Sequence, residues 1–326
     1  MAAVALLSNP RSTGNRSLLP RIRAFCAENK DIFHYEVEDV SQIGQALRTI
    51  ARVRPRAIVI NGGDGTVQAA LTELYQGGHF GDDPPPVAVL PNGKTNLIAH
   101  DLGAAGDPIT ALERVLELVR GDMVPHIVSR EMIALSGGRA GENERPVLGM
   151  FLGGAGLADT ILYCRHKIYP LGLPNWMAHL LTFMLGLVSV VVGRRSRLLP
   201  AKWKSITVTV KKSGEMQGKF AFVMVTTLEK LLLNGNVRVA GQRPGAMQLM
   251  VVERNLLSIF GAFFAALRGR LGLRSIRGVH LERGDEIRIS GARSNVILDG
   301  EMFEAADERP IVLRPTAPVP FLKLAA

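Results

Sequence analysis

The glycine-rich loop Asn61–Thr66, with the sequence NGGDGT, constrains the fold of this chain more than any other feature. It follows a continuous apolar run, Ala57–Ile60, which is typical of a strand buried on both faces. Helical spacing of apolar residues resumes near Val67–Tyr75. A buried strand, a tight glycine turn and a helix form the unit from which parallel α/β sheets are built.

The same loop has the composition of a phosphate site. Backbone N–H groups converge at a helix N-terminus, where the helix dipole favours negative charge, and glycines let the backbone approach without a Cβ clash. Thr66 can cap the helix or bond a phosphate oxygen. Asp64 suits such a place only if a cation bridges it to the phosphates or if it handles a proton. A tight turn with an aspartate cap is the alternative interpretation.

A second loop repeats this arrangement. The apolar run Val87–Leu90 predicts a strand, Pro91–Asn96 (PNGKTN) a loop, and Leu97–Asp101 the start of a helix. Two glycine loops at adjacent strand ends suit a nucleotide lying across the carboxyl edge of a parallel sheet. Lys94 can pair with a phosphate, and Asn96 can bond ribose or base. An ordinary strand–helix turn is the alternative.

The third loop of this kind, Ser8–Arg16 (SNPRSTGNR), lies between the strand predicted at Val4–Leu7 and a predicted helix. It offers hydroxyls, amides and two guanidinium groups, and Arg11 or Arg16 can neutralise a transferring phosphate. A surface turn has the same composition.

The pattern changes after about Pro125. Short strands joined by hairpin-like connectors predict a mainly antiparallel second domain, interrupted by helical insertions at about 175–192 and about 255–271. We therefore expect an α/β domain with a parallel sheet at residues 1–125 and a β-rich domain at 126–307. The predicted strands are Glu131–Leu135, Val147–Leu152, Ile206–Val210, Phe220–Val225, Met247–Val252, Val279–Leu281, Glu286–Ile289 and Val296–Leu298.

Two acids flank a glycine directly after the last of these strands, at Asp299-Gly300-Glu301. A hydroxyl group is a poor nucleophile, and a positioned carboxylate can accept its proton as a phosphoryl group arrives. A polar hairpin turn is the alternative, because Asp-Gly is a common turn pair.

Composition bears on partners and compartment. The formal net charge of +10 favours nucleotide phosphates, anionic lipid surfaces or nucleic acid. With four Tyr, two Trp and no interleaved basic–aromatic stripe, we do not expect nucleic-acid binding. The two cysteines form neither a metal pattern nor a disulfide framework. With no signal peptide recognised before Val4–Leu7, we expect a cytoplasmic protein.

Two apolar segments can contact membranes. Trp176–Gly193 is almost wholly apolar; we interpret it as a buried or groove-lining helix, with interfacial membrane contact as the alternative. Leu256–Leu273 carries three phenylalanines and ends near arginines, including Arg268, which suits either an amphipathic helix at an anionic surface or a core helix with a basic end.

Taken in order, Asn9–Gly14, Gly62–Thr66, Pro91–Asn96 and Asp299–Glu301 resemble the diacylglycerol kinase catalytic family, which includes bacterial lipid kinases and the sphingosine and ceramide kinases. The resemblance implies a β-sandwich-like second domain, an active site in the cleft between the domains, and a C-terminal segment of about 308–326 returning to the first. It also implies transfer of the γ-phosphate of ATP to a lipid hydroxyl, such as that of diacylglycerol, with Mg²⁺. A protein of this kind would be peripherally membrane-associated, and a homodimer is compatible with it.

The resemblance also implies roles for individual residues. Asp64 would help to hold Mg²⁺ and take part in catalysis, and Asp299 with Glu301 would supply the base and its support, in an order that stays open. The residues implied to bind the nucleotide are Asn9, Ser12, Gly14, Gly62, Gly63, Gly65, Thr66, Gly93, Lys94, Thr95 and Asn96.

The chain departs from the family pattern at several positions. Lys94 replaces the family's threonine, and Thr13 precedes the displaced Gly14. The acid that bacterial members place before the strand at Ala246–Val252, where it helps to bind a structural Mg²⁺, is missing, so we predict that this metal site is absent or altered. Asp159 is shifted by one position from a further family motif.

These departures leave alternatives open. One is a catalytically degenerate regulator that binds lipid or nucleotide. Another is a soluble-metabolite kinase of the NAD-kinase type, which shares the glycine–aspartate loop but is disfavoured by the late Asp-Gly-Glu and the apolar insertions.

Overall fold

The computed structural model describes residues 2–93, 95–138, 145–168, 181, 185, 205–211, 214–229, 246–268, 271, 275–291, 294–305 and 309–325. The chain divides into two compact units. Unit 1 comprises Met1–Met132, Arg145–Gly149 and Thr316–Ala326, and unit 2 comprises Ile133–Glu144 and Met150–Pro315.

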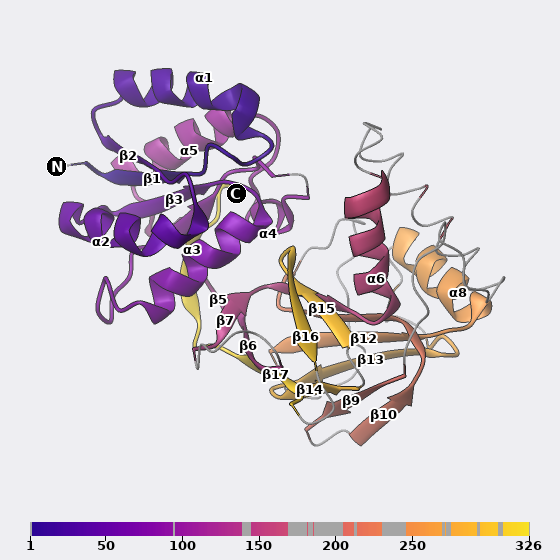
Figure 1. The fold of residues 1–326 in the computed structure, drawn as a ribbon. Coiled ribbons are helices and arrows are strands. Elements are labelled where there is room, and N and C mark those ends of the chain that lie inside the picture. Colours follow the sequence, from indigo (N-terminus) through magenta and orange to yellow (C-terminus); the bar gives the residue numbers. More distant parts are fainter. Residues whose placement is uncertain are drawn as a thin grey trace. The chain divides into compact units, whose positions relative to one another are not determined.

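Unit 1 is a six-stranded sheet with helices on both faces, and its strand order is β2-β1-β3-β4-β18-β5. Helices α1 and α5 cover one face, and α2 and α3 cover the other (Figure 1). The first four strands are parallel, β18 continues parallel to β4, and β5 is antiparallel to β18. In chain order the elements are β1 (Val4–Ser8), α1 (Asn15–Glu28), β2 (Ile32–Glu36), a 3₁₀ turn (Val40–Gln42), α2 (Ile43–Val53), β3 (Ala57–Asn61), α3 (Asp64–Gln76), β4 (Val87–Val89), α4 (Leu97–Asp101), α5 (Pro108–Arg120), a 3₁₀ turn (Val124–His126), β5 (Ile127–Arg130), β7 (Val147–Gly149) and β18 (Val319–Leu322).

The core of unit 1 follows from the apolar patterning. Every residue of β1 and β3 is buried, as expected for central strands covered on both faces. Helix α2 buries Ile43, Ala46, Leu47 and Ile50, the face that 3.6-residue periodicity predicts.

The domain boundaries expected from the sequence differ from those of the two units. Unit 1 continues past residue 125 to Met132, because β5 pairs with β18. The chain returns to unit 1 at Thr316 rather than near residue 308, because strand β17 (Ile311–Pro315) pairs with two strands of unit 2.

Unit 2 contains antiparallel sheets. In one, strands β10, β9, β14, β17 and β6 lie side by side in that order; in the other, the order is β13-β12-β11-β8-β15-β16. The mixed fold expected from the sequence, with a parallel N-terminal sheet and antiparallel C-terminal sheets, is confirmed. The elements are β6 (Ile133–Gly137), β8 (Phe151–Gly154), α6 (Gly156–Tyr163), a π-helical turn (Cys164–Ile168), β9 (Ile206–Val210), β10 (Gly214–Gly218), β11 (Phe220–Thr226), β12 (Met247–Glu253), α8 (Leu256–Leu267), β13 (Val279–Gly284), β14 (Ile287–Ser290), β15 (Ser294–Leu298), β16 (Glu301–Ala305) and β17.

The two apolar segments differ in what the structure describes of them. Trp176–Gly193 lies outside the described residues, except for Leu181 and Leu185, which pack against Cys164 and Ile168. Leu256–Leu267 forms the regular helix α8 over the β11–β12–β13 sheet. In the part of the chain that the structure describes, no helix is long and apolar enough to cross a membrane.

Candidate functional site

Three loops of unit 1 gather at one edge of its sheet. They follow β1, β3 and β4, which are neighbouring parallel strands. Because the carboxyl ends of parallel strands meet at the same edge, the loops Asn9–Gly14, Gly62–Gly63 and Pro91–Asn96 lie together there. This is the arrangement that the strand–loop–helix pattern predicts.

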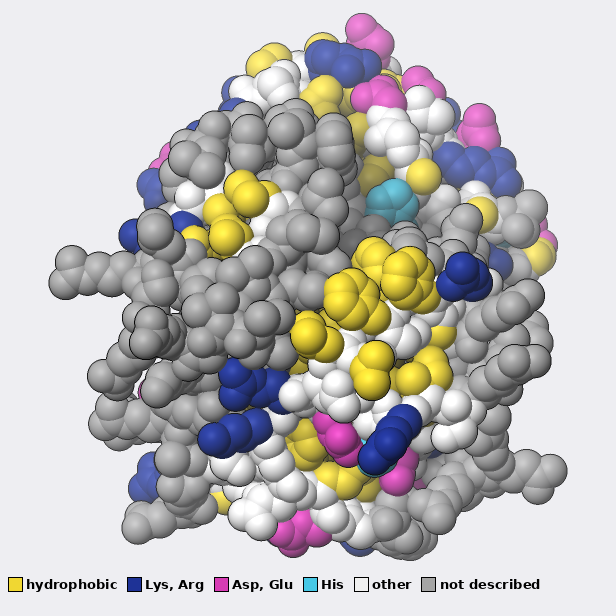
Figure 2. All heavy atoms as spheres, turned by 90° about the vertical axis from the view of Figure 1, so that its right-hand side faces the viewer, with side chains coloured by type: hydrophobic (Ala, Val, Ile, Leu, Met, Phe, Trp, Pro, Cys, Tyr) yellow, Lys and Arg dark blue, Asp and Glu magenta, His cyan; other side chains and the backbone are white. Residues whose placement is uncertain are grey.

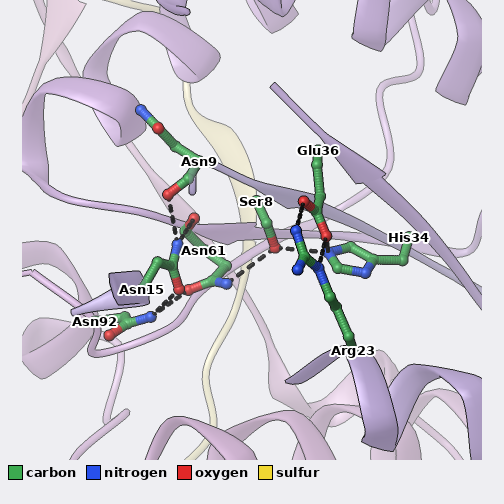
Figure 3. Close-up of polar contacts among 8 residues, drawn as sticks. All are labelled: Ser8, Asn9, Asn15, Arg23, His34, Glu36, Asn61 and Asn92. Atoms are coloured by element: carbon green, nitrogen blue, oxygen red, sulfur yellow. Dashed lines mark hydrogen bonds and ion pairs between the residues drawn. The ribbon is translucent and has the colours of Figure 1, made fainter. Parts of the chain in front are cut away.

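Three buried asparagines, Asn15, Asn61 and Asn92, join the loops to one another (Figure 3). The amide of Asn92 donates to Oδ1 of Asn61 at 2.7 Å and also to Oδ1 of Asn15. The amide of Asn15 donates to the carbonyl oxygens of Asn9 at 2.7 Å and Asn61 at 3.2 Å. A satisfied buried polar network of this kind holds its members in one geometry.

The network continues through Ser8 away from the loops (Figure 3). Nδ2 of Asn61 donates to Oγ of Ser8 at 2.9 Å, and Oγ of Ser8 lies 2.9 Å from Nε2 of His34. Burial lowers the pKa of His34, so its imidazole is neutral at pH 7. Beside it, the paired hydrogen bonds from Arg23 hold the pKa of Glu36 below its usual range. The polar chain therefore ends in an ion pair.

The first loop is tied directly to the NGGDGT loop. Nδ2 of Asn9 donates to Oγ1 of Thr66 at 2.9 Å, and both residues are buried. The backbone N–H of Gly63 donates to Oγ of Ser12 at 3.1 Å. These four predicted nucleotide residues are brought together, and the polar groups named here bond to one another.

Packing requires glycine at some positions of these loops but not at others. A Cβ on Gly62 would lie 2.7 Å from Cβ of Thr66, and one on Gly93 would lie 3.2 Å from Cα of Gly63. A Cβ on Gly63 would meet nothing within 4 Å, and the φ of −79° at Gly63 is open to any residue. Neither packing nor backbone geometry requires glycine at position 63, which leaves room for a ligand against this backbone.

Asp64 is the first residue of α3 and adjoins that open space. Burial raises the pKa of its carboxyl group to about 6, and a hydrogen bond from the Thr95 side chain offsets part of this rise. A half-buried carboxylate whose ionisation is disfavoured gains from a nearby cation. Within the described ranges, no group of three or more His, Cys, Asp and Glu side chains is arranged to hold a metal ion. One carboxylate together with phosphate oxygens is a usual way for Mg²⁺ to bind to a protein.

The third loop is closed by its own asparagine. Asn96 has a left-handed backbone with φ of 54°; its Oδ1 accepts from the N–H of Gly93, and its Nδ2 donates to the carbonyl of Gly93 at 3.0 Å. Asn96 therefore shapes the loop in this structure, whereas the sequence predicted a contact with the nucleotide. Lys94 lies outside the described residues. Gly65 lies in the first turn of α3.

Asp299 and Gly300 form the turn between β15 and β16 in unit 2, with φ values of 44° and 94°. This is the Asp-Gly hairpin turn that the sequence offered as an alternative. The buried carboxylate of Asp299 accepts the backbone N–H of Met150 at 2.8 Å and that of Phe151 at 3.0 Å. Asp299 therefore anchors the turn to β8, while Glu301, at the start of β16, is exposed.

The residues that sequence reasoning missed are Asn15, Asn61, Asn92, Ser8 and His34. A signal was present, since an asparagine follows or ends each of the three strands, at Asn9, Asn61 and Asn92. The pairing of Asn92 with Asn15 and Asn61 depends on strand order, which local patterns do not contain.

Comparisons with known proteins bear on the family and on the fold. The family model described as the diacylglycerol kinase catalytic domain matches residues 3–124, which include all three loops. No curated protein matches the sequence.

Solved structures from Bacillus anthracis str. Sterne share the fold. A candidate diacylglycerol kinase has 16% sequence identity and a TM-score of 0.64, and the match covers 97% of this chain and 94% of the other. A second structure, described as a diacylglycerol kinase, has 14% identity and a TM-score of 0.60 over the same shares. Residues 3–124 therefore resemble the diacylglycerol kinase catalytic domain in sequence, and the chain shares its fold with these solved structures.

Proposed function

We propose that this protein is an ATP-dependent kinase that phosphorylates the hydroxyl group of a lipid. The observation that carries the proposal is the open space at Gly63, next to Gly93 and the N-terminus of α3. Backbone N–H groups at a helix N-terminus, beside a glycine without a packing requirement, suit phosphate oxygens. The match of residues 3–124 to a kinase family supports ATP as the phosphate source.

In the proposed site, the NGGDGT loop would hold the phosphates and Asp64 would hold Mg²⁺. The metal would supply positive charge that neutralises the phosphates. That charge would also offset the unfavourable ionisation of the Asp64 carboxylate. The asparagine network keeps the three loops in register, so that little reorganisation is needed when the nucleotide binds.

We assign the general base to Glu301 and a positioning role to Asp299. Both oxygens of the Asp299 carboxylate accept backbone hydrogen bonds, so this carboxylate is engaged in holding the turn. Glu301 follows the rigid turn that Asp299 anchors, and its side chain is exposed. In the proposed reaction the hydroxyl gives its proton to Glu301, its oxygen bonds to the γ-phosphorus, and ADP leaves.

The proposed acceptor is a lipid alcohol such as diacylglycerol. The match to the diacylglycerol kinase catalytic domain and the apolar segments favour a lipid over a soluble metabolite. Peripheral contact with an anionic membrane, without nucleic-acid binding, belongs to the same proposal, and a homodimer is compatible with it.

The test is to incubate purified protein with labelled ATP, Mg²⁺ and a panel of lipid alcohols in mixed micelles, with NAD as a soluble acceptor. Variants Asp64→Ala and Glu301→Gln should lose transfer, and Glu215→Gln, an exposed acid on β10, should keep it. Transfer to NAD alone would favour the soluble-metabolite kinase. ATP binding without transfer to any acceptor would favour the regulator.

A further inference from the structure

Helix α8 has two apolar faces, of which one is exposed. Its inner side packs Ile259, Ala262 and Ala265 against the sheet cluster of Met224, Met250, Val252 and Leu271. The sequence suited either an amphipathic surface helix or a core helix. In the structure, α8 is anchored in unit 2 by one side and is not enclosed by it.

The outer side of α8 carries large apolar side chains. Leu257 is 81% exposed, Phe264 47% and Phe260 36%. The rings of Phe260 and Phe264 stack with centroids 6.3 Å apart, and Phe263 meets Phe264 edge-on at 5.7 Å. Figure 2 faces the side of unit 2 on which α8 lies and shows hydrophobic side chains gathered there. A contiguous aromatic surface of this kind marks an interaction site.

Basic residues lie near both ends of α8. Arg268 follows the last turn, and its guanidinium carbon lies 5.6 Å from the centre of the Phe264 ring. Exposed Lys219, Arg254 and Arg277 lie near the first turn, since the N–H of Arg254 donates to the carbonyl of Lys219 and Oγ of Ser258 donates to that of Arg277.

The acidic group described at this end is Glu253, and it is paired with His280 at 3.1 Å. The helix itself contains no charged residue. Among the described residues near the two ends of α8, basic residues therefore outnumber acidic ones.

We infer that the outer face of α8 is a docking surface for an anionic phospholipid bilayer. An apolar helix face bordered by basic residues lies in the membrane interface, where the rings enter the acyl boundary and the cations contact lipid phosphates. A second copy of this chain fits less well, because a twofold contact through α8 would bring the basic ends of the two helices together. The inference rests on the proposed function, since it names the surface from which the kinase takes its lipid.

The test is co-sedimentation of the full-length chain with vesicles of phosphatidylcholine, alone or mixed with phosphatidylserine, at low and high salt. Leu257→Glu introduces a charge at the most exposed position of α8 and should lower binding to the mixed vesicles by about tenfold. Arg268→Gln should lower it by roughly fivefold, and on the anionic vesicles alone. Val124→Glu is the matched control, because Val124 is a 70% exposed apolar residue of unit 1.

A second measurement separates docking from catalysis. Leu257→Glu should keep wild-type phosphorylation of a short-chain lipid alcohol dispersed below its micellar concentration. Vesicle binding that is lost in Leu257→Glu, in a protein that phosphorylates no lipid, would uphold the docking surface and refute the kinase. No vesicle binding by the wild type, or equal binding by Leu257→Glu, would overturn the inference. Self-association of the wild type in sedimentation velocity would also overturn it, if Leu257→Glu alone abolished that self-association and left vesicle binding unchanged.

Discussion

Gly14 and Asn92 lie so close together that a Cβ on residue 14 would fall 1.9 Å from Oδ1 of Asn92 and 2.5 Å from its carbonyl oxygen. The first loop can thus reach the third only if residue 14 has no side chain. Thr13 displaces this glycine by one position from the family pattern. Gly14 nevertheless lies where the first loop meets Asn92.

Gly14→Ala should therefore destabilise unit 1 by about 1–3 kcal/mol, because the backbone of one loop must move away.

Gly63→Ala should leave stability unchanged and weaken Mg-ATP binding by about tenfold, because its Cβ enters the proposed phosphate space. Thermal unfolding with and without Mg-ATP measures both effects. Equal loss of stability in the two variants would refute the distinction between a packing glycine and a ligand glycine.

Asp64→Asn should raise the melting temperature of the nucleotide-free protein at pH 7.5. The pKa of Asp64 is raised in the fold from 3.8 to about 6, so the stability linked to its protonation is present below the unfolded pKa and lost as pH rises through about 6. The advantage of the variant should shrink as pH falls and vanish below about pH 4. The variant should also lose stabilisation by Mg-ATP.

Asp39→Asn is the control for that experiment. The hydrogen bond from Ser41 lowers the pKa of Asp39, so its contribution is present at neutral pH and is lost as pH falls through the folded pKa. Asp39→Asn should therefore lower the melting temperature at neutral pH, whereas Asp64→Asn should raise it, and the effect of Asp39→Asn should disappear as pH falls. If Asp64→Asn melted below the wild type at pH 7.5, the hydrogen bond to Thr95 would outweigh the burial of the charge.

Asn92→Asp should destabilise unit 1 by about 2–4 kcal/mol. The substitution removes the donors to Asn61 and Asn15 and sets a carboxylate against their amide oxygens. Gln45→Glu, the same amide-to-acid change at an exposed position of α2, should be nearly neutral. Chemical denaturation of both variants is the measurement, and similar midpoints would show that the asparagine network contributes little.

Asp299→Asn should lower stability, whereas Glu301→Gln should lower activity. An amide at position 299 opposes one of the N–H groups of Met150 and Phe151 with its own N–H, which costs about 1–3 kcal/mol of stability. Glu301→Gln should leave the unfolding midpoint unchanged and lower kcat. A stable Asp299→Asn variant with no activity, beside an active Glu301→Gln variant, would transfer the role of base to Asp299.

Local patterns predicted much of the fold. The buried runs at β1 and β3 and the apolar face of α2 could be located because their periodicities are local. Strand β10 is not predicted by a local pattern, because its sequence GEMQG has little apolar character and it pairs along one edge with β9. Strand β5 was missed because its partner β18 is distant in the sequence.

The position of the three loops could be predicted from the sequence better than the contacts between them. Gly62, Gly63 and Asp64 could be placed between β3 and α3 because a glycine loop that follows a buried strand is a local pattern. The roles of Thr66 and Asn96 could not be read locally, since their side chains bond to Asn9 and Gly93 in the fold. A sequence shows which hydrogen-bonding side chains exist, but it does not show which of them bond to other parts of the protein.

The position of β18 has a consequence for biosynthesis. This strand lies between β4 and β5, so the sheet that carries the three loops has a gap until residues 319–322 have left the ribosome. Until then β4 and β5 expose unpaired edges, which are prone to pair with other chains. We therefore expect unit 1 to complete its sheet only after β18 has been translated, although most of its residues are translated early. A chain that stops short of β18 should aggregate rather than form an independent N-terminal fragment.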